Sequence, residues 1–531
     1  MKRFILLFIA AFFTISGMVY AQSNSIIVNV DQAEHTISEH IYGQFAEHLG
    51  RGIYGGIWVG TDSDIPNQEG YRTDVLNALI ELDIPNIRWP GGCFADEYNW
   101  RDGIGPRTER PKRVNAHWGM VIEDNSFGTH EFLRFTELIG AEPYISANVG
   151  NGTPREMKDW IEYMTFAGES ELANLRRVNG RDEPWSIKFF GIGNESWGCG
   201  GNMTADYYSD LYRRFQTYAT NYSGNRLYKI ASGMYDVRYD WTETLMREAG
   251  SMMDAISLHY YTIPGEGWGD KGPSHSFGEE MYYRGLKAAS LLDEFITRHS
   301  TIMDKFDPNK RVALAVDEWG IWTNPLEGTN PGFLEQQNSI RDALIASLSL
   351  DIMNAHADRV RIANIAQTVN VLQAMVLTDG PNMVLTPTYH VFHMYKVHQN
   401  SKLLPIFIDV EQFVGEGEEA VVNRFDIPMD KPGIPVISAT ASRDDSGTMH
   451  FTLTNTHPTE AKEVTIEIRG ADVKNIVPGS GRLLTANSVD AINTFDNPEN
   501  VKPVSFTDAK LNNGIMTMNI PKHSVVVISV K

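Results

Sequence analysis

Residues 156–195 carry a helix-like pattern followed by a strand-like pattern. The first segment is "EMKDWIEYMTF" (156–166), which is amphipathic at helical spacing, and the second is "WSIKFFGIGNE" (185–195). The second segment is rich in β-prone apolar residues and ends on Asn194 and Glu195. A helix that leads into a strand is the repeating unit of a parallel α/β sheet.

Similar units lie on both sides of this one, and a helix pattern separates each strand pattern from the next. The other strand-like segments are "HIYGQFAEH" (40–48), "IPNIRWPGG" (84–92), "AEPYISANVG" (141–150), "YKIASG" (228–233), "AISLHYY" (255–261), "RVALAVDEW" (311–319) and "RIANIAQTVN" (361–370). Eight such units predict an α/β fold in which the strands close into a (β/α)₈ TIM barrel.

The pattern changes after about residue 400. The segments "VISATASRDDSGTMHFTLTNT" (436–456), "EVTIEIRG" (463–470) and "HSVVVISVK" (523–531) alternate apolar and polar residues, with turn residues between them. This predicts a C-terminal antiparallel β-sandwich, jelly-roll-like in form. We expect the barrel to span residues 41–395 and the sandwich residues 396–531. A strand in residues 22–40, "SIIVNV" (25–30), is expected to join the sandwich.

The first residues have the pattern of an export signal. Lys2 and Arg3 precede an apolar run over residues 4–13, and "VYA" (19–21) resembles a signal-peptidase cleavage site. The run is shorter than the ~20 residues that a membrane span needs. We therefore predict a signal peptide over residues 1–21 and a protein exported to the periplasm or the medium.

The charge of the chain excludes some partners. Its formal net charge is −21, whereas nucleic-acid binding needs a basic surface to neutralise phosphates. Anionic membranes are disfavoured for the same reason. The sequence shows neither a zinc-ligand spacing nor a phosphate-binding loop, so we expect no metal and no organic cofactor.

Two glutamates at strand ends predict the chemistry. The active site of such a barrel lies at the C-terminal ends of its strands. Glu195 ends the fourth strand pattern and Glu318, in "LAVDEWG" (314–320), ends the seventh. A pair of carboxyl groups on one rim is the machinery of glycoside hydrolysis, in which one protonates the leaving oxygen and the other attacks or activates water. A strand-end glutamate taken alone is more often solvated or salt-bridged.

Six short motifs, in this order, resemble the α-L-arabinofuranosidases of glycoside hydrolase family 51. They are "FAEHLGRGIYGGIW" (45–58), "RWPGG" (88–92), "YNWRDGIGP" (98–106), "GIGNES" (191–196), "DEWG" (317–320) and "AQTVN" (366–370). The resemblance extends from about residue 26 to "PKHSVVVISV" (521–530). Each motif is weak alone, but the ordered set is specific.

The resemblance implies a retaining double displacement with named catalytic roles. Glu195 matches the general acid/base, and Glu318 matches the nucleophile. Arg88 and Tyr261 match residues that orient the nucleophile, and the positive charge of Arg88 would lower the pKa of Glu318. His259 could hydrogen-bond near the nucleophile and help to orient it, or it could be an ordinary core histidine.

The resemblance also implies a set of sugar-binding residues. Asn194 matches a ligand of the sugar's 2-hydroxyl, and Tyr261 is expected to reach the sugar as well. Glu47 and Gln367 match residues that bind hydroxyls, although Glu47 could instead pair with Arg51. Trp118, in "NAHWGM" (115–120), matches a tryptophan against which the substrate packs.

One position departs from the family pattern. Family members frequently have "RYPGGN", whose asparagine contacts a sugar hydroxyl, whereas this chain has "RWPGGC" with Cys93 in that place. A thiol is a weak donor, so this contact is weakened. Cys93 and Cys199, which follow the second and fourth strands, could form a disulfide between two rim loops or remain two buried thiols.

The sequence thus predicts an exo-acting α-L-arabinofuranosidase of plant arabinan, arabinoxylan or their oligosaccharides, and the resemblance implies more than one subunit. Two alternatives stay open. One is an endo-β-1,4-glucanase or β-xylosidase on the same scaffold, because fold does not fix the substrate. The other is a carbohydrate-binding protein with an inactive barrel.

Overall fold

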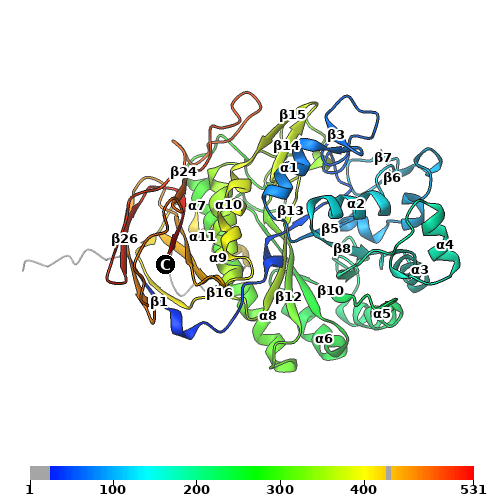
Figure 1. The fold of residues 1–531 in the computed structure, drawn as a ribbon, viewed down its shortest axis with the longest axis horizontal. Helices are drawn as coiled ribbons and strands as arrows, with labels where there is room; N and C mark the ends of the chain where they lie inside the picture. The colour runs from blue at the N-terminus through cyan, green and yellow to red at the C-terminus, as the bar shows by residue number, and fades with distance from the viewer. Residues whose placement is uncertain (1–23, 426–431) are drawn as a thin grey trace, which may run out of the picture.

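The computed structural model describes residues 24–425 and 432–531, and these form a barrel packed against a β-sandwich (Figure 1). The predicted signal peptide lies outside the described residues. Eight parallel strands close the barrel in chain order: β2 (Gly43–Phe45), β5 (Asn86–Trp89), β8 (Glu142–Ala147), β9 (Phe189–Ile192), β10 (Tyr228–Tyr235), β11 (Ala255–Thr262), β12 (Ala313–Ile321) and β13 (Val360–Ala366). The predicted (β/α)₈ barrel is confirmed.

Helices connect successive strands around the outside of the barrel. They are α1 (Thr73–Glu81), α2 (Thr129–Ile139), α3 (Pro154–Thr165), α4 (Glu171–Val178), α5 (Ala205–Tyr218), α6 (Tyr239–Ala249), α7 (Glu279–Ser290), α8 (Leu292–Phe306) and α9 (Ile340–Ala355). The start of α3 shows how the sequence sets a boundary. Thr153 caps the backbone N–H of Glu156, whose carboxylate accepts from the backbone N–H of Thr153, and Pro154 takes the first helical position. This reciprocal cap satisfies donors that the first turn leaves free.

The sandwich consists of two sheets around its own apolar core. One sheet has the order β17 (Ile406–Asp409), β1 (Asn24–Asn29), β22 (Lys462–Arg469), β26 (Ile515–Ile520) and β25 (Ala509–Asn512). The other has the order β16 (Lys402–Leu403), β20 (Ile437–Arg443), β21 (Met449–Asn455), β27 (Ser524–Val530), β23 (Arg482–Leu484) and β24 (Val504–Ser505). Strand β1 pairs antiparallel with β17 but parallel with β22, so this sheet is not antiparallel throughout. β1 and β22 are far apart in the sequence, so no hairpin forces them to run antiparallel.

Helix α9 lies between the barrel and the sandwich, where Figure 1 also places α7 and α10 (Pro387–Tyr395). One side of α9 packs on β12, and the other meets β20, β21 and β27. Nearly every residue of α9 is buried, as expected of a helix that is covered on all sides. Its buried Asp351 accepts hydrogen bonds from Ser438 (2.6 Å), Thr440 (2.7 Å) and Tyr395 (3.0 Å). Burial nevertheless raises the pKa of Asp351 to about 7.

Candidate active site

The residues predicted for the active site gather at the C-terminal end of the barrel. Each comes from a strand or from the turn that follows it. Glu47 follows β2, Arg88 lies in β5, Cys93 follows β5, Asn194, Glu195 and Cys199 follow β9, His259 and Tyr261 lie in β11, Glu318 lies in β12, and Gln367 follows β13. Trp118 reaches the same rim from the turn between β6 (Arg113–Asn115) and β7 (Val121–Glu123).

Glu318 is buried and fixed by donors on both carboxylate oxygens. Arg88 donates to Oε1 (2.9 Å), and the hydroxyl of Tyr261 donates to Oε2 (2.9 Å). A side chain at Gly92 would bring its Cβ to 2.7 Å from Oε1, so the "PGG" turn lets the backbone approach the carboxylate. Burial raises the pKa of Glu318, while the positive charges of His259 and Arg88 act in the opposite direction. The sequence predicted that Arg88 would lower the pKa of Glu318; its charge acts in that direction, but burial outweighs it and the pKa is raised.

Glu195 sits in a strained turn directly after β9. The strand ends at Ile192, and Glu195 has a φ of 38°, a left-handed conformation that is unusual for a residue with a side chain. The backbone N–H groups of Gly198 (2.7 Å) and Gly200 (3.1 Å) donate to the Glu195 carbonyl and hold the turn. Such strain costs about 1–3 kcal/mol and is typical of functional sites. The turn places Asn194 and Glu195 side by side at the rim.

His259 connects the two glutamates. Its Nδ1 lies 2.8 Å from Oε1 of Glu195 and 3.5 Å from Oε2 of Glu318, and its Nε2 lies 3.2 Å from Oδ1 of Asp317. Burial lowers the pKa of His259, but the carboxylates of Glu318, Asp317 and Glu195 outweigh burial and raise it to about 10. The structure thus places His259 against both glutamates, whereas the sequence prediction linked it only with the nucleophile.

The raised pKa of His259 predicts a pH-dependent contribution to stability. A group whose pKa rises from 6.5 to about 10 on folding stabilises the folded state fully below pH 6.5, and that contribution disappears as the pH rises through about 10. We expect the difference in unfolding free energy between the wild type and His259→Gln to shrink steadily over this interval, measured by urea denaturation at several pH values. The exposed His35→Gln serves as the control. A difference that stays constant from pH 6.5 to 10 would contradict the assignment.

Asn194 is held by its neighbours on both sides. Its Oδ1 accepts from Nη2 of Arg88 (2.6 Å), and its backbone N–H donates to Oδ2 of Asp96 (2.8 Å). Asp96 also accepts from the backbone N–H groups of Val149 (2.7 Å) and Gly150 (2.8 Å) and so ties three rim loops together. Asp96 was not predicted, because an aspartate in a loop carries no sequence signal of its own.

Glu47 is buried at the floor of the site and does not pair with Arg51. Its Oε1 accepts from Trp118 Nε1 (2.9 Å) and from the backbone N–H of Gly92 (3.0 Å) and Phe94 (3.2 Å), and its Oε2 accepts from Gln367 Nε2 (3.0 Å). Burial, together with the charge of Glu318, raises the pKa of Glu47 to about 7 against these hydrogen bonds. The alternative partner, Arg51, forms an ion pair with Glu335 instead (2.9 Å).

These groups surround a cavity of about 160 Å³ at the rim. It is smaller than the ~300–1,000 Å³ of a pocket for a drug-sized ligand, which suits one sugar ring. Its lining combines the carboxylates with aromatic and aliphatic side chains: Glu47, Leu49, Gly92, Cys93, Trp118, Glu195, Trp197, Tyr235, Tyr261, Trp268, Glu318, Trp322, Leu334, Gln367 and Leu372. Tyr235, Trp268 and Trp322 were not predicted. Tyr235 and Trp322 lie near strand ends, where core packing also places aromatic residues, and Trp268 lies in the long loop after β11.

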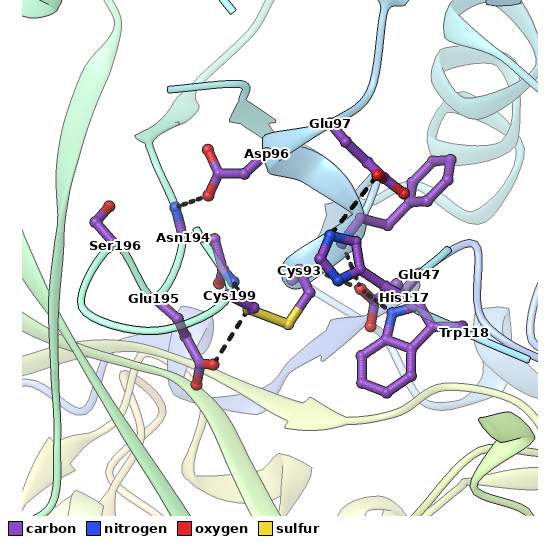
Figure 2. Close-up of a disulfide and its surroundings, with 12 residues drawn as sticks. Glu47, Cys93, Asp96, Glu97, His117, Trp118, Asn194, Glu195, Ser196 and Cys199 are labelled. Carbon is purple, nitrogen blue, oxygen red and sulfur yellow. Dashed lines mark hydrogen bonds and ion pairs between the residues drawn. A yellow bond between two sulfur atoms is a disulfide. The ribbon is translucent and has the colours of Figure 1, made fainter. Parts of the chain in front are cut away.

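The two cysteines are joined by a disulfide (Figure 2). Cys93 begins the short 3₁₀ helix after β5, Cys199 lies in the glycine-rich loop after β9, and their Cα atoms are 5.5 Å apart. Of the two arrangements that the sequence left open, the structure contains the cross-link. It connects a loop that touches Glu47 with the loop that carries Glu195.

Two groups of side chains among the described residues have metal-ligand spacing. They are Cys93 with Glu195 and Cys199, and Glu195 with His259 and Glu318; within each group the ligand atoms lie within 4.8 Å of one another. Within residues 24–425 and 432–531, none of the helices combines the length and apolarity needed to cross a membrane.

Known proteins match the chain along nearly its whole length. A family model described as the "Alpha-L-arabinofuranosidase 1 domain" matches residues 78–271, and the "Alpha-L-arabinofuranosidase C-terminal domain" matches residues 317–524. An "Intracellular exo-alpha-L-arabinofuranosidase" of Bacteroides ovatus is 50% identical over 99% of both chains.

Solved structures agree with these sequence matches. The GH51 arabinofuranosidase of Xanthomonas axonopodis pv. citri has a TM-score of 0.91 and 49% identity and covers 96% of this chain and 100% of its own. An α-L-arabinofuranosidase of Thermotoga maritima, solved as an arabinose complex, has a TM-score of 0.82 and 32% identity over 96% of this chain and 99% of its own.

The comparison with the Bacteroides ovatus relative contradicts the prediction of export. The Bacteroides ovatus relative aligns with 99% of this chain and is named an intracellular enzyme. The prediction depended on one short apolar segment after two basic residues, and that composition alone does not decide export. The predicted signal peptide and the periplasmic or extracellular location are therefore not carried further.

The resemblance seen in the six motifs is confirmed by these comparisons. The alignment with the Bacteroides ovatus relative, at 50% identity, covers almost the whole chain, including the segments that carry Glu195 and Glu318. The predicted glycoside hydrolase has the expected barrel, and the two glutamates face one cavity. The chain belongs to the α-L-arabinofuranosidases of glycoside hydrolase family 51.

Proposed function

We propose that the protein is an exo-α-L-arabinofuranosidase that removes terminal arabinofuranosyl units by double displacement. Glu318 attacks the anomeric carbon while Glu195 protonates the leaving oxygen. Glu195 then takes a proton from the water that releases arabinose. The observation that carries the proposal is that Glu195 and Glu318 line one small cavity and share His259.

The spacing of the carboxylates supports retention of configuration. One oxygen of Glu195, one of Glu318 and a ring nitrogen of His259 lie within 4.8 Å of one another. Inverting enzymes keep their carboxyl groups about 6.5–9.5 Å apart to admit a water, whereas retaining enzymes bring them to about 5–5.5 Å. The approach of these two oxygens to within 4.8 Å is compatible with the shorter separation and so with direct attack by Glu318.

The surrounding residues suit a neutral furanose. Glu47 and Gln367 can exchange their mutual hydrogen bond for sugar hydroxyls, and Oε1 of Gln367 is buried with no hydrogen-bond partner among the described residues. Asn194 and Tyr261 border the catalytic pair and are proposed to contact the sugar, and Trp118 supplies a flat wall. Arg88, Tyr261 and His259 are proposed to orient Glu318. None of these roles calls for a metal or an organic cofactor.

The proposed substrates are plant arabinan, arabinoxylan and their oligosaccharides. The small cavity favours removal of one terminal unit and disfavours the open cleft that an endo-β-1,4-glucanase requires. A bifunctional glucanase-xylanase, CelM2, shares only 12% identity with a TM-score of 0.59, so it supports the fold alone. An inactive carbohydrate-binding barrel is disfavoured because both carboxylates and their donors are in place.

More than one subunit is also proposed, from the family resemblance. The β6–β7 hairpin exposes Val114 (54%), Met120 (70%) and Ile122 (60%), and Val114 is paired with Ile122 across the hairpin. Light scattering on the purified protein tests this directly.

We expect the protein to release arabinose from linear arabinan and arabinoxylan and to leave cellulose intact. NMR spectra taken during early turnover of an aryl α-L-arabinofuranoside should show the α-anomer of arabinose first, because two displacements restore the configuration. First appearance of the β-anomer would refute double displacement, and soluble oligosaccharides from cellulose would favour the endo-glucanase alternative.

A further inference from the structure

The Cys93–Cys199 disulfide crosses the rim of the cavity beside the proposed acid/base. Both cysteines are partly exposed, and Cys93 lines the cavity itself, so a small reagent can reach the bond. Disulfides persist mainly in oxidising compartments, and the prediction of export is contradicted. The reduced form of the pair is therefore relevant to function.

The two carboxylate oxygens of Glu195 face different partners. Oε1 lies 2.8 Å from Nδ1 of His259. Oε2 points the other way and lies 3.6 Å from Sγ of Cys199 (Figure 2). A carboxylate oxygen of Glu195 and the two sulfurs lie within 4.8 Å of one another. In the oxidised protein the two sulfurs are bonded to each other and cannot act as thiolate ligands. Reduction would free both sulfurs to bind a cation together with the carboxylate of Glu195.

We propose that reduction of the Cys93–Cys199 disulfide creates a binding site for a thiophilic divalent cation such as Zn²⁺, formed by both thiolates and Glu195, and that the bound cation switches hydrolysis off. The site stands on this geometry alone. Only the loss of activity rests on the proposed function, because it depends on Glu195 acting as the acid/base.

The chemistry needs a dithiol as the reductant. One of its thiolates attacks a cysteine sulfur and breaks the disulfide, and its second thiol closes a cyclic disulfide and releases the first sulfur. The dithiol loses two electrons and two protons, and both cysteines become thiols. Zn²⁺ then displaces the two thiol protons into solvent, because thiolates are the metal ligands.

The distances fit tetrahedral zinc. With Zn–S of about 2.3 Å and Zn–O of about 2.0–2.2 Å, a sulfur and an oxygen on one tetrahedral ion lie about 3.6 Å apart. Sγ of Cys199 and Oε2 of Glu195 are already 3.6 Å apart. The two sulfurs would need a separation of about 3.8 Å, which side-chain rotation can provide once the bond is broken. The fourth position is left for water.

A cation at this site would inactivate the enzyme in a specific way. Glu195 bound to Zn²⁺ can neither donate nor accept a proton, and general acid–base help is worth about 10²–10⁴ in rate. Reduction without metal should leave Glu195 in place, because His259 and the backbone donors of Gly198 and Gly200 still hold it.

The experiment titrates Co²⁺ and Zn²⁺ into oxidised protein, into protein reduced with dithiothreitol and then freed of it, and into the Cys93→Ser/Cys199→Ser variant. The reduced wild type should bind a single cation with the ultraviolet charge-transfer band of thiolate–cobalt bonds. It should lose activity with Zn²⁺ and recover it with EDTA. The serine variant keeps the other group with metal-ligand spacing, Glu195 with His259 and Glu318. It therefore measures any cation binding that does not involve the cysteines.

The proposal is overturned if reduced protein shows no thiolate–cobalt band, if Zn²⁺ inhibits all three proteins alike, or if Zn²⁺ binds the thiolates while turnover continues. The comparison of oxidised with reduced wild type needs no variant to fold. Failure of the proposed function looks different: metal-free oxidised protein would not hydrolyse arabinofuranosides, yet the thiolate–cobalt band of the reduced protein would still appear.

Discussion

Replacing Glu318 by alanine is expected to abolish turnover of every arabinofuranoside. The Glu318 carboxylate is the proposed nucleophile, and both carboxylate oxygens are held in place by hydrogen bonds from Arg88 and Tyr261. Removal of the nucleophile of a serine protease lowers kcat by about 10⁶, and we expect a loss of that order. Steady-state release of 4-nitrophenol from its α-L-arabinofuranoside measures it.

The control for Glu318→Ala is Glu327→Ala, which removes an exposed glutamate from the loop after the same strand. Its activity should match the wild type. Thermal unfolding distinguishes lost chemistry from lost folding, because Glu318 also compensates the buried charge of Arg88. A folded Glu318→Ala protein that keeps more than a trace of activity would remove Glu318 from the role of nucleophile.

Replacing Glu195 by alanine is expected to have an effect that depends on the leaving group. A natural glycosidic oxygen is a poor leaving group and needs a proton, so arabinan hydrolysis should fall by about 10²–10⁴. The first step with an activated aryl arabinofuranoside needs little protonation and should fall far less. Its second step still lacks a base, so the covalent intermediate should accumulate and appear as a burst of phenol.

Added azide provides a second measurement on Glu195→Ala. Azide needs no base, so it should react with the intermediate, restore aryl turnover and give an arabinosyl azide of retained configuration. Equal losses on both classes of substrate, with no azide rescue, would exclude Glu195 as the acid/base. Glu327→Ala again serves as the control.

The fold was predictable because its signal is repeated. Each βα unit contributes a period-3.6 segment and a short apolar run, and eight repeats leave little choice of architecture. The candidate residues at strand ends were predictable for the same reason, because a parallel barrel brings every strand end to one rim. Glu195 and Glu318 were found from this rule together with the motifs around them.

Contacts that depend on loops could not be predicted in the same way. Asp96 ties three loops together, and Trp268 borders the cavity from a long loop, yet neither belongs to a periodic pattern. The sequence also left the partner of Glu47 open, since spacing along a chain does not say whether Arg51 or Gln367 lies closer in space. The apolar segment near the N-terminus led to a wrong prediction of export, because its composition alone does not decide where a protein is located.

Helix α9 makes the sandwich part of the catalytic unit. One side of α9 packs on β12, the strand that carries Glu318. Its other side packs on β20, β21 and β27 of the sandwich. A gene fragment that stopped after Tyr395 would leave this apolar helix bare and the Asp351 carboxyl without its hydroxyl partners Ser438 and Thr440. The barrel is thus not expected to fold as an independent domain. The surface that covers α9 is complete only when the last strand, β27, has been synthesised.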